Sequence, residues 1–235
     1  MDLSNGPRLG VYGSLLMLLG MVVMLAIGVL ITVDVLAVVY PTAAGANGML
    51  NSSINQTLIT QQAQTEALSV LNQFTVPVIA DIAIQIAGVL FLALSFAALG
   101  RTYKEDKMGR YGYYGAALIV AALVVELVGP QVLGMAVFVL ELIGFLIYMF
   151  VLRYISRSTA SNKFRYYGYG LVAGALLNLI NPIGTIIFIV VFALMALEFR
   201  NAGAAAAQGG KSPFDTAEIT SGASLKRKTS NKDKK

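Results

Sequence analysis

The 235-residue chain contains no cysteine, no histidine and no tryptophan. The first two absences exclude disulfides, thiolate chemistry, the usual zinc sites, histidine-ligated haem and any histidine-based catalytic triad. Charge is also scarce, because charged residues make up 12% of the chain against roughly 25% in ordinary soluble domains. Hydrophobic residues make up 57%, so too few polar side chains remain to cover a soluble core. The composition therefore indicates an integral membrane protein.

Apolar runs of the length that a bilayer requires, about 17 residues or more, predict six membrane-spanning helices. The first run exceeds that length and is interpreted as an uncleaved anchor, because a signal peptide has a shorter apolar core. The fifth and sixth runs are short, so this pair either crosses a thin bilayer or forms a re-entrant hairpin. The predicted spans are residues 9–40, 76–99, 111–128, 132–152, 166–180 and 183–199.

The basic residues are confined to one side of these spans. All 17 lysines and arginines lie in the N-terminal segment, in the second and fourth connections between spans, or in the C-terminal tail. Because positively charged segments stay in the cytoplasm during membrane insertion, both termini are predicted to be cytoplasmic. The expected fold is an all-α integral membrane protein of the plasma membrane, with residues 1–200 forming six transmembrane helices arranged as three helical hairpins.

Three similar segments open the odd-numbered spans. Each has an arginine, a tyrosine four residues later and a glycine five residues later, and each even-numbered span ends at an arginine. A hairpin repeated three times around a common centre explains this pattern. The alternative is that arginine, tyrosine and glycine simply mark the inner membrane boundary. The three glycines are Gly13, Gly115 and Gly170, and the closing arginines are Arg101, Arg153 and Arg200.

Small residues within the spans predict close helix contacts. Gly170 and Gly174 form a Gly-x-x-x-Gly motif, which lets the backbones of two apolar helices approach. Packing within the chain explains such glycines as well as dimerisation does. Further glycines stand at comparable turns, namely Gly20, Gly28, Gly112, Gly115, Gly134 and Gly144.

The last two hairpins carry motifs of a known type. A basic connection contains Arg153-Tyr154-Ile155-Ser156 and Phe164-Arg165-Tyr166, and Asn181-Pro182-Ile183-Gly184 forms the turn of the final pair. In these features, clearest over residues 150–200, the chain resembles an uncharacterised archaeal family of small multi-pass membrane proteins. The resemblance implies lineage and topology, and it implies no activity.

The first connection, residues 41–75, is rich in polar uncharged residues and is predicted to lie outside the cell. It contains two N-glycosylation sequons, at Asn51 and Asn55. Their coincidence with the predicted outer face favours a glycosylated surface, as in archaea or eukaryotes. The alternative is that the sequons arose by chance in a segment rich in serine and threonine.

The C-terminal tail, residues 201–235, begins with an Ala/Gly-rich linker and becomes polybasic. We expect it to be a disordered cytoplasmic segment that is attracted to anionic lipid headgroups. Docking to RNA, the ribosome or an acidic partner is the alternative, and no specific nucleic-acid site is predicted. The basic residues expected to contact lipid or a partner are Lys226, Arg227, Lys228, Lys232, Lys234 and Lys235.

Polar side chains within the apolar spans are the candidate functional residues. Glu126 and Glu141 lie deepest, about 24 Å and about 18 Å along their helices from the nearest basic residues at 1.5 Å per residue. Because charging a carboxyl group in hydrocarbon costs several kcal/mol, we expect both to be protonated or to face a cavity. The other polar residues are Asp34 and Asp81, expected near the outer boundary, Glu198, expected at the inner boundary, and Gln85 and Asn178, candidate neighbours of the two glutamates.

These residues support two functional hypotheses. The glutamates either carry protons or cations, or act as neutral carboxyl groups that hydrogen-bond between helices. Because no transport-type binding motif and no metal or cofactor ligand set is present, the leading prediction is a non-catalytic accessory or scaffold subunit of a membrane assembly, or an envelope protein. Its expected partners are membrane lipids, including anionic headgroups at the cytoplasmic face, and other membrane subunits or further copies of itself. The alternative is a small proton-coupled transporter or channel, and a membrane enzyme comes third.

Overall fold

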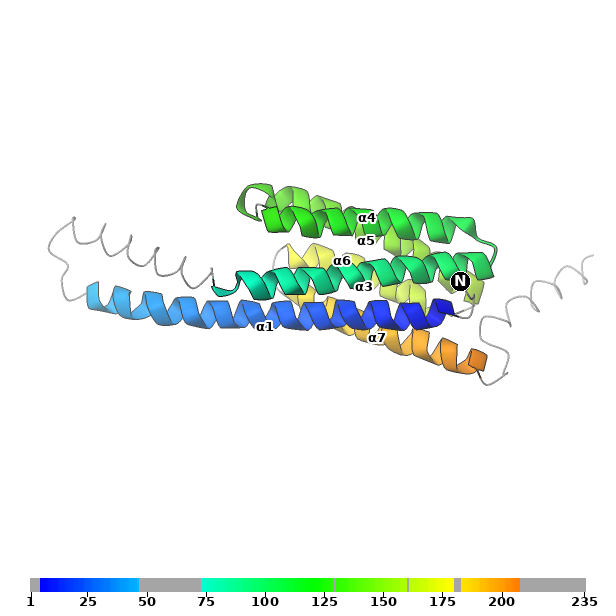
Figure 1. Ribbon diagram of the computed structural model, residues 1–235, viewed down its shortest axis with the longest axis horizontal. Coiled ribbons are helices and arrows are strands. Elements are labelled where there is room, and N and C mark those ends of the chain that lie inside the picture. Colours follow the sequence, from blue (N-terminus) through cyan, green and yellow to red (C-terminus); the bar gives the residue numbers. More distant parts are fainter. Residues whose placement is uncertain (1–4, 47–72, 129, 160, 180–182, 208–235) are drawn as a thin grey trace, which may run out of the picture. The chain divides into compact units, whose positions relative to one another are not determined.

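The computed structural model describes residues 5–46, 73–128, 130–159, 161–179 and 183–207 (Figure 1). These residues form α-helices and no strand, so the predicted all-α class is confirmed for them. Five of the helices contain segments long and apolar enough to cross a membrane, which is consistent with a multi-pass membrane protein. The helices are α1 (Gly6–Ala46), α3 (Thr75–Thr102), α4 (Asp106–Val128), α5 (Pro130–Thr159), α6 (Lys163–Asn178) and α7 (Ile183–Ala207).

Two helices differ from the predicted spans in an informative way. Helix α6 has 16 residues and is not among the five helices that could cross a membrane by length and composition. Helix α7 continues to Ala207, so the first residues of the predicted disordered tail are helical. Alanine has the highest helix propensity, and the run from Ala204 to Ala207 therefore extends the helix rather than ending it.

The basic connection between α3 and α4 is a tight turn. Lys104 adopts a left-handed backbone conformation, with φ of 55°. The N–H of Glu105 donates to the carbonyl of Gly100 at 2.8 Å, and the N–H of Lys104 donates to that of Arg101 at 3.3 Å. This pair of bonds is a Schellman motif, which satisfies the last carbonyl groups of a helix. The turn keeps the basic residues of this connection together at one end of both helices.

The chain divides into two compact units, Gly20–Ala83 and a larger one formed by Met1–Leu19 with Ile84–Lys235. In the larger unit, α4 packs along α5, α5 along α6 and α6 along α7. Aromatic side chains fill its core. The ring centroids of Phe96 and Tyr148 lie 5.2 Å apart and those of Phe145 and Phe188 lie 4.9 Å apart, so rings from α3, α5 and α7 hold the helices together.

The glycine shared by the three predicted repeats makes an equivalent contact in each helix pair. In each pair, the glycine of the first helix contacts a residue of the second helix. That residue lies nine positions before the arginine that closes the second helix. If these residues only marked the inner membrane boundary, each glycine would lie at a similar depth in the membrane. It would not need to contact an equivalent residue of the second helix. The equivalence therefore supports the repeat over the boundary alternative. The contacts are Gly13 with Leu92, Gly115 with Gly144, and Gly170 with Val191.

A second set of glycines joins neighbouring helix pairs within the larger unit. In each case a glycine near the start of a pair packs against the second helix of another pair. The second pair contacts the first, the third contacts the second, and the first contacts the third. Three packing units around a common centre would make these contacts, as the repeat predicts. The contacts are Gly112 with Phe96, Gly168 with Met149, and Gly10 with Phe199.

Candidate functional site

The two deep glutamates lie on neighbouring helices, Glu126 on α4 and Glu141 on α5. The contact between Gly115 and Gly144 sets the register of this pair. Counted from that contact, Glu126 lies 11 residues and Glu141 three residues toward the same end of the pair, so the two glutamates are offset by eight residues, or roughly 12 Å along the axis. Their carboxyl groups interact electrostatically, and both side chains are half-buried. The structure therefore places the two candidate residues on helices that contact each other and within electrostatic range.

The proximity of two carboxyl groups restricts what the pair can do. Two like charges in apolar surroundings repel each other, so the pair is more stable when it retains a proton. A carboxyl group that keeps its proton can donate a hydrogen bond, and one donated to the neighbouring helix would fasten α4 to α5. The same proton, if exchangeable, would be one step of a conduction pathway. The geometry is compatible with both hypotheses, and they differ in whether the proton is released.

The other polar residues of the predicted spans lie in different environments. Asn178, at the end of α6, accepts a hydrogen bond through Oδ1 from Thr185 Oγ1 of α7 at 3.1 Å. It therefore links these two helices, a role that the sequence did not suggest. Gln85 is buried on α3 in the larger unit. In the smaller unit, Asp34 is exposed on α1 and Asp81 is buried on α3.

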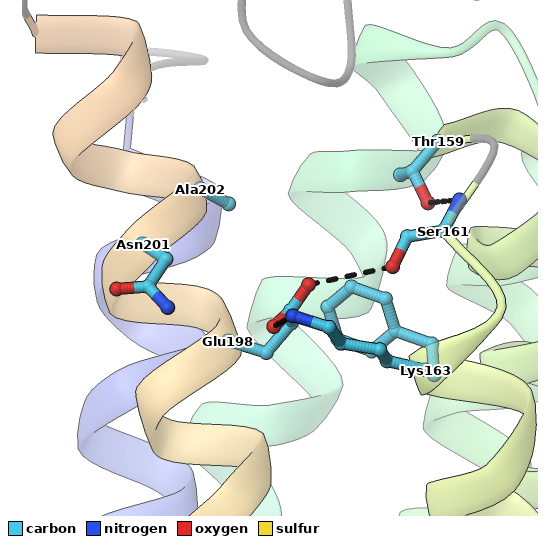
Figure 2. A pocket seen from close by; sticks show the side chains of 7 residues that line it. Thr159, Ser161, Lys163, Glu198, Asn201 and Ala202 are labelled. Carbon is cyan, nitrogen blue, oxygen red and sulfur yellow. Dashed lines mark hydrogen bonds and ion pairs between the residues drawn. The ribbon is translucent and has the colours of Figure 1, made fainter.

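A cavity of about 310 Å³ lies where α5 ends, α6 begins and α7 passes, lined by Thr159, Ser161, Lys163, Phe164, Glu198, Asn201 and Ala202. Figure 2 shows Ser161 and Lys163 pointing toward Glu198. Ser161 Oγ donates to Glu198 Oε1 at 3.3 Å, and Lys163 Nζ forms an ion pair with Glu198 Oε2 at 2.9 Å. Both carboxylate oxygens are therefore engaged, one by the connection between α5 and α6 and the other by the first residue of α6.

The exposure of this ion pair is uneven and indicates its role. The Glu198 side chain is 16% exposed, whereas that of Lys163 is 63% exposed. The hydrogen bond to Glu198, and then its charge, raise the pKa of Lys163 above the ordinary value. An ion pair this open to water contributes little stability, so we assign it to positioning the α5–α6 connection. The sequence placed Glu198 beside Arg200 and missed Lys163, because the two partners are 35 residues apart.

Several predicted sites lie outside the described residues. The sequons at Asn51 and Asn55 are among them, as are the polybasic residues at positions 226–235. Glycosylation of the first connection and lipid contact by the tail therefore stay predictions. Among the residues that the structure does describe, no cluster of three or more acidic side chains could hold a metal ion.

No family model matches the sequence, and neither a curated protein nor a solved structure is significantly similar to it.

Proposed function

We propose that the chain is a non-catalytic polytopic membrane protein that serves as an accessory or scaffold subunit of a membrane assembly, or as an envelope protein. The observation that carries the proposal is a glycine of α5 that stands open, next to an exposed apolar stripe on the same helix. Elsewhere in the larger unit, glycines such as Gly115, Gly144 and Gly170 have another helix in contact. Gly134 of α5 has no other heavy atom within 4 Å of the position that a Cβ would take.

The surroundings of Gly134 favour a helix of another subunit. Met135 is 70% exposed, and Val139 and Ile143 follow it at intervals of four residues, so the three form an exposed apolar stripe along α5. At 3.6 residues per turn, Gly134 lies to one side of this stripe rather than on it. Glycine beside larger apolar residues is the pattern with which membrane helices associate closely. A surface that met only lipid would gain nothing from a glycine, which weakens a helix by roughly 0.5–1 kcal/mol relative to alanine. The open glycine and the exposed stripe together support a docking surface on α5, as a scaffold role requires.

Replacing Gly134 with leucine tests this proposal. The leucine meets open space in the isolated chain, so we expect unchanged or slightly higher stability in detergent. The same leucine would prevent close approach of a partner helix, so we expect the proteins that co-purify with the wild-type chain from native membranes to be lost. Ala117→Leu is the matched control, because it also adds a leucine at an exposed small residue, on α4.

For each variant, we compare the proteins that co-purify with the chain and the stability of the chain in detergent. Retention of all partners by Gly134→Leu would refute docking at this face, and purification of the wild-type chain alone would refute the scaffold role. Loss of partners from Ala117→Leu as well would show a general effect of added bulk rather than a defined surface.

We further propose that the chain crosses the plasma membrane six times as three hairpins, with both termini in the cytoplasm. The one-sided distribution of all 17 basic residues supports this topology. Helix α6, at 16 residues, spans about 24 Å, which suits a locally thin bilayer. In the sequence, the apolar run continues past Asn178 through Leu179 and Ile180.

The second candidate function is a proton or cation pathway through Glu126 and Glu141, favoured by the electrostatic contact between them. Glutamine keeps the volume and hydrogen bonding of a neutral glutamate but cannot release a proton. If the pair only fastens α4 to α5, Glu141→Gln should be nearly silent, whereas Glu141→Leu should lower the free energy of unfolding by roughly 1–2 kcal/mol. We expect this structural outcome.

Flux through vesicles distinguishes the two functions. Wild type and Glu141→Gln are reconstituted side by side, and proton flux is followed with an entrapped pH dye under an imposed gradient. We expect no difference between them. Wild-type flux that disappears in a correctly folded Glu141→Gln variant would establish the pathway and replace the scaffold role as the leading function.

A further inference from the structure

Two adjoining cavities lie on the surface of α4 and α5 at their basic ends. One, of about 390 Å³, is lined by Tyr111, Ile147, Phe150 and Tyr154. The other, of about 200 Å³, is lined by Phe150, Arg153, Tyr154 and Arg157. The two share Phe150 and Tyr154 in their linings, and we name them together the α4–α5 groove. It lies apart from the glutamate pair and from the cavity at Glu198.

One end of the α4–α5 groove is strongly basic. Arg153 and Arg157 are one helical turn apart on α5 and therefore present their guanidinium groups on the same face. Neither makes an ion pair or a hydrogen bond with another side chain in the part of the chain that the structure describes. A guanidinium group presents a planar fork of donors that matches the oxygens of a phosphate. Two neighbouring guanidinium groups without an acidic partner therefore form a site that can bind an anion.

The other end of the groove is apolar. Ile147 and Phe150 precede the arginines by one to three turns and lie toward the apolar middle of α5. The rings of Tyr111 and Tyr154 stack across the two helices, with centroids 6.4 Å apart and an angle of 24° between their planes. Tyrosine rings of this kind belong at the level of lipid headgroups. The groove thus changes from basic to apolar in the direction in which a phospholipid changes from headgroup to acyl chain.

Comparison of the three repeats shows that an aromatic ring followed by a second basic residue occurs in the second helix pair and not at the equivalent positions of the other two. Positions equivalent to Tyr154 and Arg157 follow the closing arginines of the other two pairs at the same spacing. They are Thr102 and Glu105 after Arg101, and Asn201 and Ala204 after Arg200. Neither of those sets combines an aromatic ring with a second cation. The second pair therefore departs from the repeat at the residues that line the groove.

We propose that the α4–α5 groove binds one anionic phospholipid, with its phosphate between Arg153 and Arg157 and an acyl chain along Ile147 and Phe150. Basic pockets between membrane helices bind anionic headgroups in this manner. The site is independent of the scaffold role, and it differs from the tail, whose lysines would attract a charged surface without selecting a single molecule. A bound lipid would cover the exposed ring of Phe150 and neutralise the paired arginines.

Native mass spectrometry of the full-length chain released from detergent tests the proposal. Phosphatidylglycerol and phosphatidylcholine with identical acyl chains are added separately. We expect one phosphatidylglycerol to be retained at concentrations at which phosphatidylcholine is not. Arg153→Gln with Arg157→Gln should weaken that binding by about tenfold or more, since each basic residue near a headgroup contributes substantially. Phe150→Ala should also weaken it while leaving the charge unchanged.

Charge-matched controls separate a defined site from general attraction. Arg101→Gln with Lys107→Gln removes the same charge from exposed positions near the α3–α4 turn and should leave phosphatidylglycerol binding unchanged. Equal weakening by both double variants would overturn the groove, as would equal retention of the two lipids. Displacement of the lipid by millimolar glycerol phosphate would identify a simple anion site and overturn the role of the acyl chain. Thermal unfolding of each variant verifies that it is folded.

Discussion

Replacing Gly13 with leucine is expected to destabilise the packing of α1 on α3 by about 3 kcal/mol or more, at the upper end of what overpacking costs. A Cβ at this position would lie 2.7 Å from the backbone nitrogen of Leu92 and 2.9 Å from the carbonyl oxygen of Gly88. Backbone atoms cannot move aside by changing a rotamer, so the two helices would have to separate. The reciprocal contact is equally tight, since a Cβ on Gly88 would lie 2.9 Å from the nitrogen of Met17.

The matched control lies on the same helix. Gly28 has no other heavy atom within 4 Å of the position of a Cβ, so Gly28→Leu adds the same side chain to α1 without a clash. The measurement is unfolding of the purified chain by sodium dodecyl sulfate titrated into mild detergent, followed by loss of helical circular dichroism. We expect the midpoint to fall sharply for Gly13→Leu and to stay near the wild-type value for Gly28→Leu. Equal midpoints for the two variants would contradict the close contact.

The apolar runs and the glycines in the sequence predicted the positions of the helices and several of the contacts between them. Hydropathy predicted the helices because a bilayer requires long apolar segments, and their approximate positions agree with the observed helices. The recurrence of glycine five residues after an arginine predicted repeated packing, and Gly13, Gly115 and Gly170 do make equivalent contacts. These features were accessible because each depends on residues that are close in sequence or on a constraint that the membrane imposes everywhere.

Features that depend on the register between helices were less accessible. Sequence placed Glu126 and Glu141 on adjacent helices, but their electrostatic contact depends on how α4 slides along α5. The ion pair of Lys163 with Glu198 joins residues from separate helices, and no local sequence pattern predicts it. The α4–α5 groove likewise combines Tyr111 of α4 with side chains of α5. Each site arises from tertiary packing, which periodicity alone does not determine.

Topology offers the other large expected effect, an all-or-none difference in labelling by a membrane-impermeant thiol reagent. The chain has no cysteine, so a single introduced thiol is read without background. We expect Ser52→Cys, in the first connection, to react in intact cells. Ser158→Cys, near the end of α5 among the basic residues, should react only after the membrane is permeabilised. The reverse pattern would contradict the predicted orientation, because retention of positive charge in the cytoplasm is its physical basis.

The same experiment tests whether α6 and α7 cross the membrane. Asn181→Cys places a thiol between a helix of 16 residues and one of 25, at the turn of the third predicted hairpin. If both helices cross, the thiol should react from outside as Ser52→Cys does. Protection in intact cells, with reaction only after permeabilisation, would make the pair a re-entrant hairpin.

The charge pattern alone does not distinguish these topologies, because Arg165 and Arg200 would lie in the cytoplasm in both. We expect labelling from outside, since the third pair makes the same glycine contact, Gly170 with Val191, as the two longer pairs.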